Sequence, residues 1–378
     1  MIFGISSTFS QRFTQVCLSL VAFTFVLIPV TPALAKSPIT LDACQQMDPV
    51  TMAEKSEYIM NSYNYLLKAT NEISDLTLRK QVSEYLKNPI PTVMKQFPTD
   101  SEKEVLKQQL VTAGYIKSDT TYNQILPPIQ DATKAPQPFY AAPGSGYMGH
   151  HSYPGGLATH VAVVTKSALG IYNAYKETYG IEMNKDVIIA STMMHDMNKP
   201  WVFQWQKDGA SLPEYTIAGT GAHHILSIAE AMYRGFPKEV IVAMACAHTP
   251  PSNPQDEQQV VAWLKAAAII AGKNPVEIGV VDPQGNTLPQ PRWMEGFITH
   301  LGDHDYILTG PMAGWLITKL GDIAKTEYNM SDSDLKSSKF YTFRNYVFSQ
   351  ITVERLYNIW VIGGDKALLS TVISLVTK

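Results

Sequence analysis

The hydrophobic positions of this 378-residue chain recur with a helical period over most of its length. In TMAEKSEYIMNSYNYLLKA, for example, Ile59, Tyr63 and Leu66 follow a spacing near 3.6 residues. Further along, SEKEVLKQQLVTAGYI begins with the pattern of a capping box, from Ser101 to Glu104. Alternating patterns typical of β-strands are nearly absent, so the sequence predicts an all-α protein.

A long segment rich in proline, glycine and aromatic residues separates the first helices from a second helical series. It reads PPIQDATKAPQPFYAAPGSGYMGHHSYPGG, and its aromatic residues argue against simple disorder. Helices are then predicted from near Gly155, in KDVIIASTMMHD, from about Thr220 to RGFP, in KEVIVAMACAH and in DEQQVVAWLKAAAIIAGKNP. The expected organisation is a helical N-terminal segment (36–126), a core (127–275) and a helical C-terminal extension packed on that core (276–378).

The first 35 residues have the pattern of a secretory signal peptide. Arg12 is their only charge, an apolar stretch follows it, and the small residues of TPALA favour cleavage after Ala35. The alternative is an uncleaved membrane anchor, but the apolar run is shorter than the roughly 20 residues of a spanning helix, and Pro29 and Pro32 interrupt its end. We therefore expect an exported protein with no membrane span after cleavage, periplasmic in a Gram-negative organism and otherwise secreted.

Charge and cysteine content narrow the possible functions. Removing Arg12 with the leader leaves 29 Lys and Arg, one fewer than the full 30, against 33 Asp and Glu. This mild and dispersed negative balance predicts no nucleic-acid interface. Cys44 and Cys246 either form one disulfide between distant positions or remain two small buried hydrophobes, and the sequence leaves both readings open. The pattern does not determine the oligomeric state.

All nine histidines lie within residues 150–304, which a uniform scatter would not produce. Four of them stand near the ends or beginnings of predicted helices: His160, His195, His224 and His248. A single histidine on an apolar face is usually a core residue, but four of them with Asp196 favour a metal site. Imidazole and carboxylate groups projecting inward from several helices hold zinc, iron or manganese, and an ion would offset the cost of burying Asp196.

Helical faces distinguish the two adjacent histidines of GAHHILSIAEAM. His224 shares a stripe with Ile228 and Met232, so it is expected to face the core. His223 aligns with Ser227 and Ala231, which makes it the less buried neighbour.

The blocks HHSYPGGLATH, MMHDMNK, GAHHILSIAEAM and MACAH, in this order, resemble the HD-domain superfamily of metal-dependent phosphohydrolases. The resemblance covers roughly residues 149–272 and implies an HD-domain-like helical bundle with additional N- and C-terminal helices. It implies the metal ligands His160, His195, Asp196, His224 and His248, with Asp196 placed to bridge two ions. His223 is a possible additional ligand.

The same resemblance assigns residues to catalysis and to the substrate. Asp196 and Lys199 are expected to be catalytic, and Lys199 would stand near the phosphate unless it is only a solvated lysine at a helix end. The expected substrate-binding residues are His151, Tyr153 and Lys199.

One position departs from the family pattern. The closing aspartate of the family lies on a helix that reads like LKAADIIAG, whereas this chain reads LKAAAIIAG and has Ala268 in the expected place. Asp303 or Asp305, in GDHDY, are candidates to replace it, unless this segment is an exposed acidic turn. If neither does, the site is incomplete.

The function expected from these residues is hydrolysis of a small phosphomonoester or phosphodiester by a metal-activated water. One or two divalent transition-metal ions are expected, with manganese, iron, nickel and zinc equally compatible. One alternative is an HD-fold protein that has lost hydrolysis and binds a ligand or partner. Another, placed last, is a di-iron HD-fold oxygenase.

Overall fold

Helices make up nearly all of the regular structure, as the hydrophobic pattern predicts. The protein is described by a computed structural model of residues 37–378, so the signal-peptide prediction for residues 1–35 lies outside the described residues. Within 37–378 the strands are only two residues long: β1 (Ile39–Thr40), β2 (Thr216–Ile217), β3 (Thr220–Gly221) and β4 (Val376–Thr377). β1 pairs in parallel with β4, and β2 pairs with β3 in an antiparallel hairpin. The all-α prediction is confirmed.

The N-terminal third consists of short helices with polar caps. They are α1 (Leu41–Gln45), α2 (Pro49–Glu54), α3 (Glu57–Ala69), α4 (Leu76–Lys87), α5 (Asp100–Thr112) and α6 (Tyr122–Ile125). Three short 3₁₀ helices accompany these α-helices: η1 (Thr70–Glu72), η2 (Thr92–Gln96) and η3 (Phe139–Ala141). The predicted capping box is wrong by two residues: Thr99, not Ser101, caps α5, and its partner is Glu102. Thr99 precedes the helix, so its side chain can accept a hydrogen bond from the backbone N–H of Glu102, which has no partner within the helix.

The central series begins after the proline-rich segment, as predicted. Its members are α7 (Gly156–Tyr179), α8 (Lys185–Met194), α9 (Lys199–Val202), α10 (Ala222–Tyr233), α11 (Lys238–Ala245) and α12 (Pro254–Ala271). Asn184 caps α8 by accepting hydrogen bonds from two backbone N–H groups, and every α8 residue from Val187 onward is buried. An apolar helix surrounded by others can place its C-terminal end deep in the protein.

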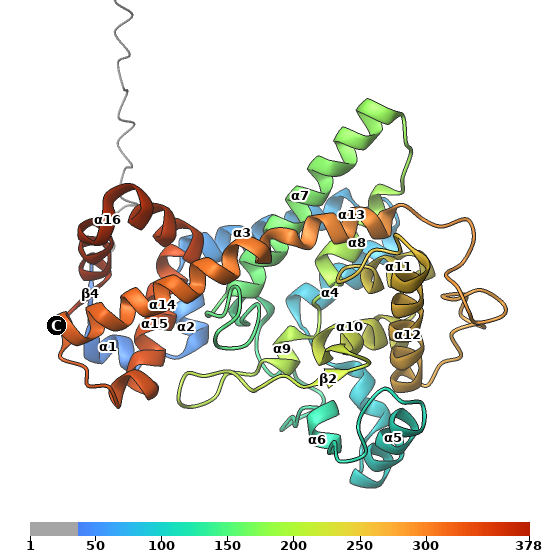
Figure 1. Ribbon diagram of the computed structural model, residues 1–378, viewed down its shortest axis with the longest axis horizontal. Helices are drawn as coiled ribbons and strands as arrows, with labels where there is room; N and C mark the ends of the chain where they lie inside the picture. Colours follow the sequence, from blue (N-terminus) through green and yellow to red (C-terminus); the bar gives the residue numbers. More distant parts are fainter. Residues whose placement is uncertain (1–36) are drawn as a thin grey trace, which may run out of the picture. The chain divides into compact units, whose positions relative to one another are not determined.

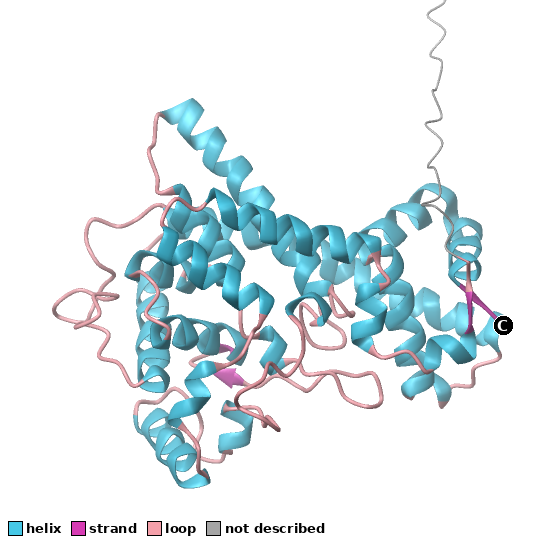
Figure 2. Cartoon of the chain, turned by 180° about the vertical axis from the view of Figure 1, so that it is seen from behind, coloured by secondary structure: helices cyan, strands magenta, loops and turns pink. Residues whose placement is uncertain are grey.

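The C-terminal third first adds a helix to the central series and then forms a second apolar cluster. Its helices are α13 (Glu295–Gly302), α14 (Tyr306–Tyr328), α15 (Ser338–Ile351) and α16 (Val353–Leu375), with 3₁₀ turns η4 (Asp303–Asp305) and η5 (Asp334–Lys336). Helix α13 packs on α7, α8 and α11. Helix α14 then leads to a second apolar cluster, in which α14–α16 pack with α1 and α2 (Figure 1). Figure 2 shows the same helices from behind.

One buried arginine fixes the glycine-rich part of the long loop. Arg344 of α15 is fully buried and donates to the carbonyl oxygens of Tyr147 at 2.7 Å and Ser152 at 2.6 Å. The loop needs glycine where it meets α7, because a Cβ on Gly156 would lie 1.8 Å from the carbonyl oxygen of His151. The segment that carries His151 is therefore held from both sides.

Two further sequence questions concern cysteines and membrane spans. Cys44 and Cys246 are both buried and unpaired, in agreement with the reading as two small hydrophobes. Among residues 37–378, none of the helices combines the length and the hydropathy that crossing a bilayer requires.

Candidate metal centre

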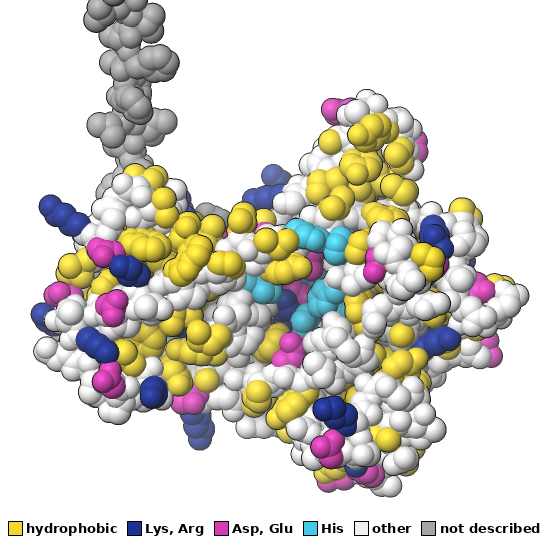
Figure 3. All heavy atoms as spheres, in the orientation of Figure 1, with side chains coloured by type: hydrophobic (Ala, Val, Ile, Leu, Met, Phe, Trp, Pro, Cys, Tyr) yellow, Lys and Arg dark blue, Asp and Glu magenta, His cyan; other side chains and the backbone are white. Residues whose placement is uncertain are grey.

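The candidate centre forms where the ends of three packed helices meet. His160 lies near the start of α7, His195 caps the C-terminal end of α8, and Asp196 follows it. Asp303 stands at the C-terminal end of α13, and all four side chains are buried. Figure 3 shows histidine side chains gathered in a hollow of the surface, beside acidic and basic groups.

The first group of candidate ligands is His160, His195 and Asp303, whose ligand atoms lie within 4.8 Å of one another. Oδ1 of Asp303 is 3.2 Å from Nε2 of His160 and 3.3 Å from Nε2 of His195. Oδ2 of Asp196 is 3.2 Å from each of the same two nitrogen atoms. Two imidazoles and two carboxylates thus converge on one small volume.

These atoms converge without forming hydrogen bonds to one another. Nε2 of His160, Nε2 of His195 and both carboxylate oxygens of Asp196 are buried and have no hydrogen-bond partner within the described chain, although Oδ2 of Asp196 also forms an ion pair with Lys199. Buried polar atoms are nearly always satisfied, so several orphaned atoms around one point indicate an ion. The residues present fit a divalent transition metal, which imidazole and carboxylate groups bind.

Each histidine of this group is oriented through its other ring nitrogen. Nδ1 of His195 donates to the carbonyl oxygen of Thr192 at 2.8 Å, and Nδ1 of His160 donates to Oδ1 of Asp305 at 3.0 Å. Both contacts leave Nε2 facing the centre, which is the arrangement common to metal-binding histidines. Asp303 is therefore a candidate ligand, whereas Asp305 supports the ligand His160.

The second group consists of Asp196, His223 and His248, again within 4.8 Å of one another. Oδ1 of Asp196 is 3.4 Å from Nε2 of His223, so the two oxygens of Asp196 face different groups. The geometry matches an aspartate that bridges two ions. Nδ1 of His223 donates to Glu214 at 2.5 Å, and Nδ1 of His248 lies 3.1 Å from Oγ1 of Thr220.

The β2–β3 hairpin in front of α10 and the segment that precedes it supply these supporting groups. Glu214 also accepts a hydrogen bond from the backbone N–H of His223, at 2.9 Å. Gly221 makes room for it, since a Cβ there would lie 2.7 Å from Oε1 of Glu214. Nothing in the sequence SLPEYT marks Glu214 as part of a site, and sequence reasoning missed it.

Opposite charges offset the cost of burial in the first group. Burial disfavours the imidazolium of His195, but the carboxylates of Asp196 and Asp303 outweigh it and raise the pKa of His195 to about 9. Burial likewise opposes the charge of Asp303, yet the neighbouring imidazoles hold the pKa of this carboxyl well below its usual value. When no ion is bound, a protonated imidazole therefore supplies the positive charge that these carboxylates need.

The second group has the opposite electrostatics. Burial, followed by the charge of His223, lowers the pKa of His248 to about 3. His248 is therefore neutral at physiological pH, and the neutral imidazole is the form that binds metal.

Lys199 lies inside the centre rather than on the surface. Its side chain is buried, and Nζ is 2.5 Å from Oδ2 of Asp196. This position excludes the reading of Lys199 as a solvated lysine at a helix end.

His224, expected among the ligands, lies outside both groups. Its Nε2 donates to the carbonyl oxygen of Ala245 at 3.2 Å, and its ring stacks on His248 with centroids 4.0 Å apart. The side chain that turns toward Asp196 is that of its neighbour His223. His224 is fully buried whereas His223 is 8% exposed, so the less buried histidine faces the centre.

The two other residues expected to bind substrate are both buried. Tyr153 shares a hydrogen bond between its hydroxyl and Oγ1 of Thr159, at 2.8 Å, in the protein interior. Nε2 of His151 lies 3.1 Å from Oε1 of Glu354 and 3.5 Å from Oδ2 of Asp305. His151 also joins His150 and His160 in a third group of converging ligand atoms.

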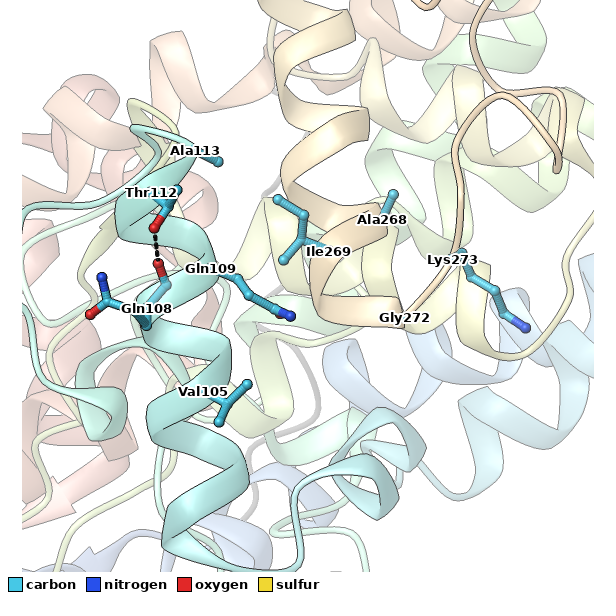
Figure 4. Close-up of a pocket in the computed structure, with 9 residues that line it drawn as sticks. All are labelled: Val105, Gln108, Gln109, Thr112, Ala113, Ala268, Ile269, Gly272 and Lys273. Atoms are coloured by element: carbon cyan, nitrogen blue, oxygen red, sulfur yellow. Dashed lines mark hydrogen bonds between the residues drawn. The ribbon is translucent and has the colours of Figure 1, made fainter.

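Ala268 lies elsewhere, in a groove between α5 and α12 that contains none of the candidate ligands (Figure 4). The alternative reading of GDHDY as an exposed acidic turn does not hold for Asp303, which is 5% exposed. The carboxylate that accompanies His160 and His195 is thus supplied by α13, the next helix along the chain. An alanine at position 268 leaves the first group complete.

Comparison with known proteins agrees with this geometry. No protein-family model and no solved structure matches the chain. A curated relative, dihydroneopterin 2′,3′-cyclic phosphate phosphodiesterase from Methanocaldococcus jannaschii, is 33% identical over 183 residues. The aligned region covers 48% of this chain and 58% of the relative, so the chain spans little more than half the length of the curated protein it matches. This similarity makes the chain a distant homologue of that phosphodiesterase, and the buried histidine and aspartate groups agree with the HD-domain resemblance of the sequence.

Proposed function

We propose that the protein is a metal-dependent phosphohydrolase that acts on a small phosphodiester. The observation that carries the proposal is Asp196, whose two buried carboxylate oxygens face two different groups of buried imidazoles. The activity of the relative, a cyclic phosphate phosphodiesterase, supports the class of ester. A phosphomonoester is the second choice within the same chemistry.

The candidate ligands would form two adjacent metal sites. His160, His195 and Asp303 would hold one, His223 and His248 the other, and Asp196 both. A divalent ion supplies Lewis-acid chemistry there, offsetting charge on phosphoryl oxygens and making water more acidic. Thr192, Asp305 and Glu214 keep the imidazoles oriented, as described above.

Lys199 contributes a positive charge that needs no ion. Without metal its ammonium pairs with Asp196 at 2.5 Å. With Asp196 engaged as a metal ligand, the same ammonium would be available to a phosphoryl oxygen. A lysine is suited to this role because its point charge sits on a flexible stem.

The alternative of an HD-fold protein without hydrolysis rested on Ala268. Since Asp303 supplies a carboxylate 3.2 Å from His160, that alternative loses its support. Among the contacts of residues 37–378, none favours an oxygenase over a hydrolase.

The test combines metal analysis with turnover. The purified chain is reconstituted with manganese, iron, nickel or zinc and assayed on bis(p-nitrophenyl) phosphate and on 2′,3′-cyclic nucleotides, with p-nitrophenyl phosphate as the monoester. We expect metal-dependent diester hydrolysis that His195→Ala abolishes. Full metal loading without turnover of any ester would contradict the proposal.

We also propose that residues 1–35 direct export, on the strength of the charge, apolar stretch and TPALA pattern. Expression of the full gene product with N-terminal sequencing of the exported fraction tests this. The expected mature protein begins at Lys36, and a chain retained inside the cell with Met1 intact would contradict it.

A further inference from the structure

A second cavity lies next to the metal centre and has no role in the proposed reaction. It measures about 570 Å³ and is enclosed by α3, α7, α14 and the start of α16. Its lining includes His151 and Asp305. Because Asp305 also bonds to Nδ1 of His160, a single carboxylate separates this cavity from a candidate metal ligand.

The inner end of the cavity is rich in hydrogen-bond acceptors. Glu354 and Asp305 both line it, on either side of His151. Oε1 of Glu354 is buried and has no hydrogen-bond partner in the described chain, although Nε2 of His151 is 3.1 Å away. A ligand with N–H or O–H groups would satisfy this oxygen.

Backbone strain accompanies the same contact on both sides. Thr352, two residues before Glu354, has φ 63° and ψ 154°, and His151 has φ 52°. A β-branched residue in the first of these conformations is a true outlier, and such strain persists mainly at functional positions. The chain thus holds His151 and Glu354 together at a cost, which is an independent sign that the cavity has a function.

The outer end of the cavity carries two positive charges without a counter-ion. Lys166 lies over the ring of Tyr65 at 4.5 Å, and Arg355 lies over the ring of Tyr58 at 4.7 Å. Neither forms an ion pair with a carboxylate of residues 37–378, so their N–H donors are free for an anion, which guanidinium and ammonium groups bind well. Leu308, 65% exposed, adds an apolar wall to the same cavity.

We propose that this cavity binds a small organic phosphate, such as a nucleotide, with its phosphate on Lys166 and Arg355 and its N–H or O–H donors on Glu354 and Asp305. The site is separate from the metal centre, because Asp305 and His160 lie between them. It does not depend on the proposed hydrolysis, and it assigns a use to the C-terminal helices that supply Glu354 and Arg355.

The experiment measures binding without turnover. Adenosine 5′-monophosphate, adenosine and inorganic phosphate are titrated by calorimetry into the full chain and into His195→Ala, which is expected to lack metal. We expect the nucleotide to bind both proteins alike, and adenosine to bind at least about tenfold more weakly, since charge-assisted bonds to the phosphate are lost.

Paired variants separate the two ends of the cavity. Lys166→Ala with Arg355→Ala should weaken the nucleotide at least about tenfold and leave adenosine unchanged. Glu354→Ala should weaken both ligands. The matched control, Lys80→Ala with Lys95→Ala, removes two exposed cations from other helical segments and should change neither affinity.

Three results overturn the proposal. The first is a wild-type chain that binds no nucleotide. The second is a double variant of Lys166 and Arg355 that binds it as the wild type does. The third is loss of binding in His195→Ala, which would place the phosphate on the metal centre instead. A chain inactive on every ester but positive in this titration would contradict only the proposed hydrolysis.

Discussion

Asp303→Asn removes one buried carboxylate of the candidate metal centre while nearly preserving its shape. Oδ1 of Asp303 is within 3.3 Å of Nε2 of both His160 and His195, so an ion held by these residues loses a charged ligand. Groups that only support a ligand change metal affinity by about 10–100-fold. For a ligand itself we expect at least about 100-fold, which corresponds to about 2.7 kcal/mol of binding free energy.

The metal-free protein should lose stability in the same variant. Asp303 faces two buried imidazoles whose pKa values its carboxylate helps to raise. Breaking a buried ion pair costs about 3–5 kcal/mol when the remaining charge has no partner. Because Asp196 still faces both imidazoles, we expect the lower end of that range, about 3 kcal/mol.

The assay is metal content after dialysis, followed by a manganese titration and by thermal unfolding with and without metal. Asp305→Asn is the matched control, since it removes a supporting carboxylate two residues away. It should weaken metal binding about tenfold, less than Asp303→Asn does.

Ala268→Asp tests the other possible location of the final acid. Ala268 is 1% exposed and lies in the groove between α5 and α12, so a carboxylate there should lower stability and bind no additional metal. Recovery of metal binding in the combined variant Asp303→Asn with Ala268→Asp would refute the assignment, as would metal affinity of Asp303→Asn within threefold of wild type.

Three other outcomes follow from the structure. His195 is protonated near neutral pH in the metal-free chain, because its pKa is about 9. Metal binding should therefore release a proton, and the metal affinity should rise about tenfold per pH unit up to pH 9. Calorimetry in buffers of different ionisation enthalpy measures the released proton, and its absence would contradict the prediction. Glu214→Gln should weaken one of two bound ions about tenfold by loosening His223, seen as a biphasic manganese titration. Arg344→Met should lower the free energy of unfolding by about 3 kcal/mol, because the carbonyls of the loop lose charge-assisted bonds, and denaturant melts should detect it; an unchanged midpoint would contradict it.

Sequence reasoning located the parts of the site that local patterns determine. Helices α7, α8, α10, α11 and α12 follow hydrophobic periodicity and glycine or proline stops, and His160, His195 and Asp196 stand at helix ends that such patterns reveal. It failed where the choice depends on the direction of a side chain in the folded protein. His224 is the more buried histidine of its pair, but a ligand that also meets a substrate must face an accessible hollow, and His223 does so.

The sequence offers Asp305 and Asp303 as candidates for the missing acid, but it does not show which of them reaches the centre, and the structure favours Asp303. Its neighbours His160 and His195 are distant in sequence, and the contact exists because α13 crosses α7 and α8. No periodicity within α13 records that crossing. A family pattern placed the acid on α12, since position in a pattern was the only guide available without tertiary contacts.

The helices after residue 275 therefore do more than cover a finished core. The turn η4 that follows α13 places both Asp303, beside His160, and Asp305, which supports His160. Arg344 of α15 fixes the loop that carries His151. A metal centre needs several ligands held to within a fraction of an ångström, and such precision requires that each ligand be packed from behind. In this chain the packing comes from the C-terminal segment, so the candidate centre is a property of the whole unit Ser37–Lys378 and not of the segment that carries the HD pair.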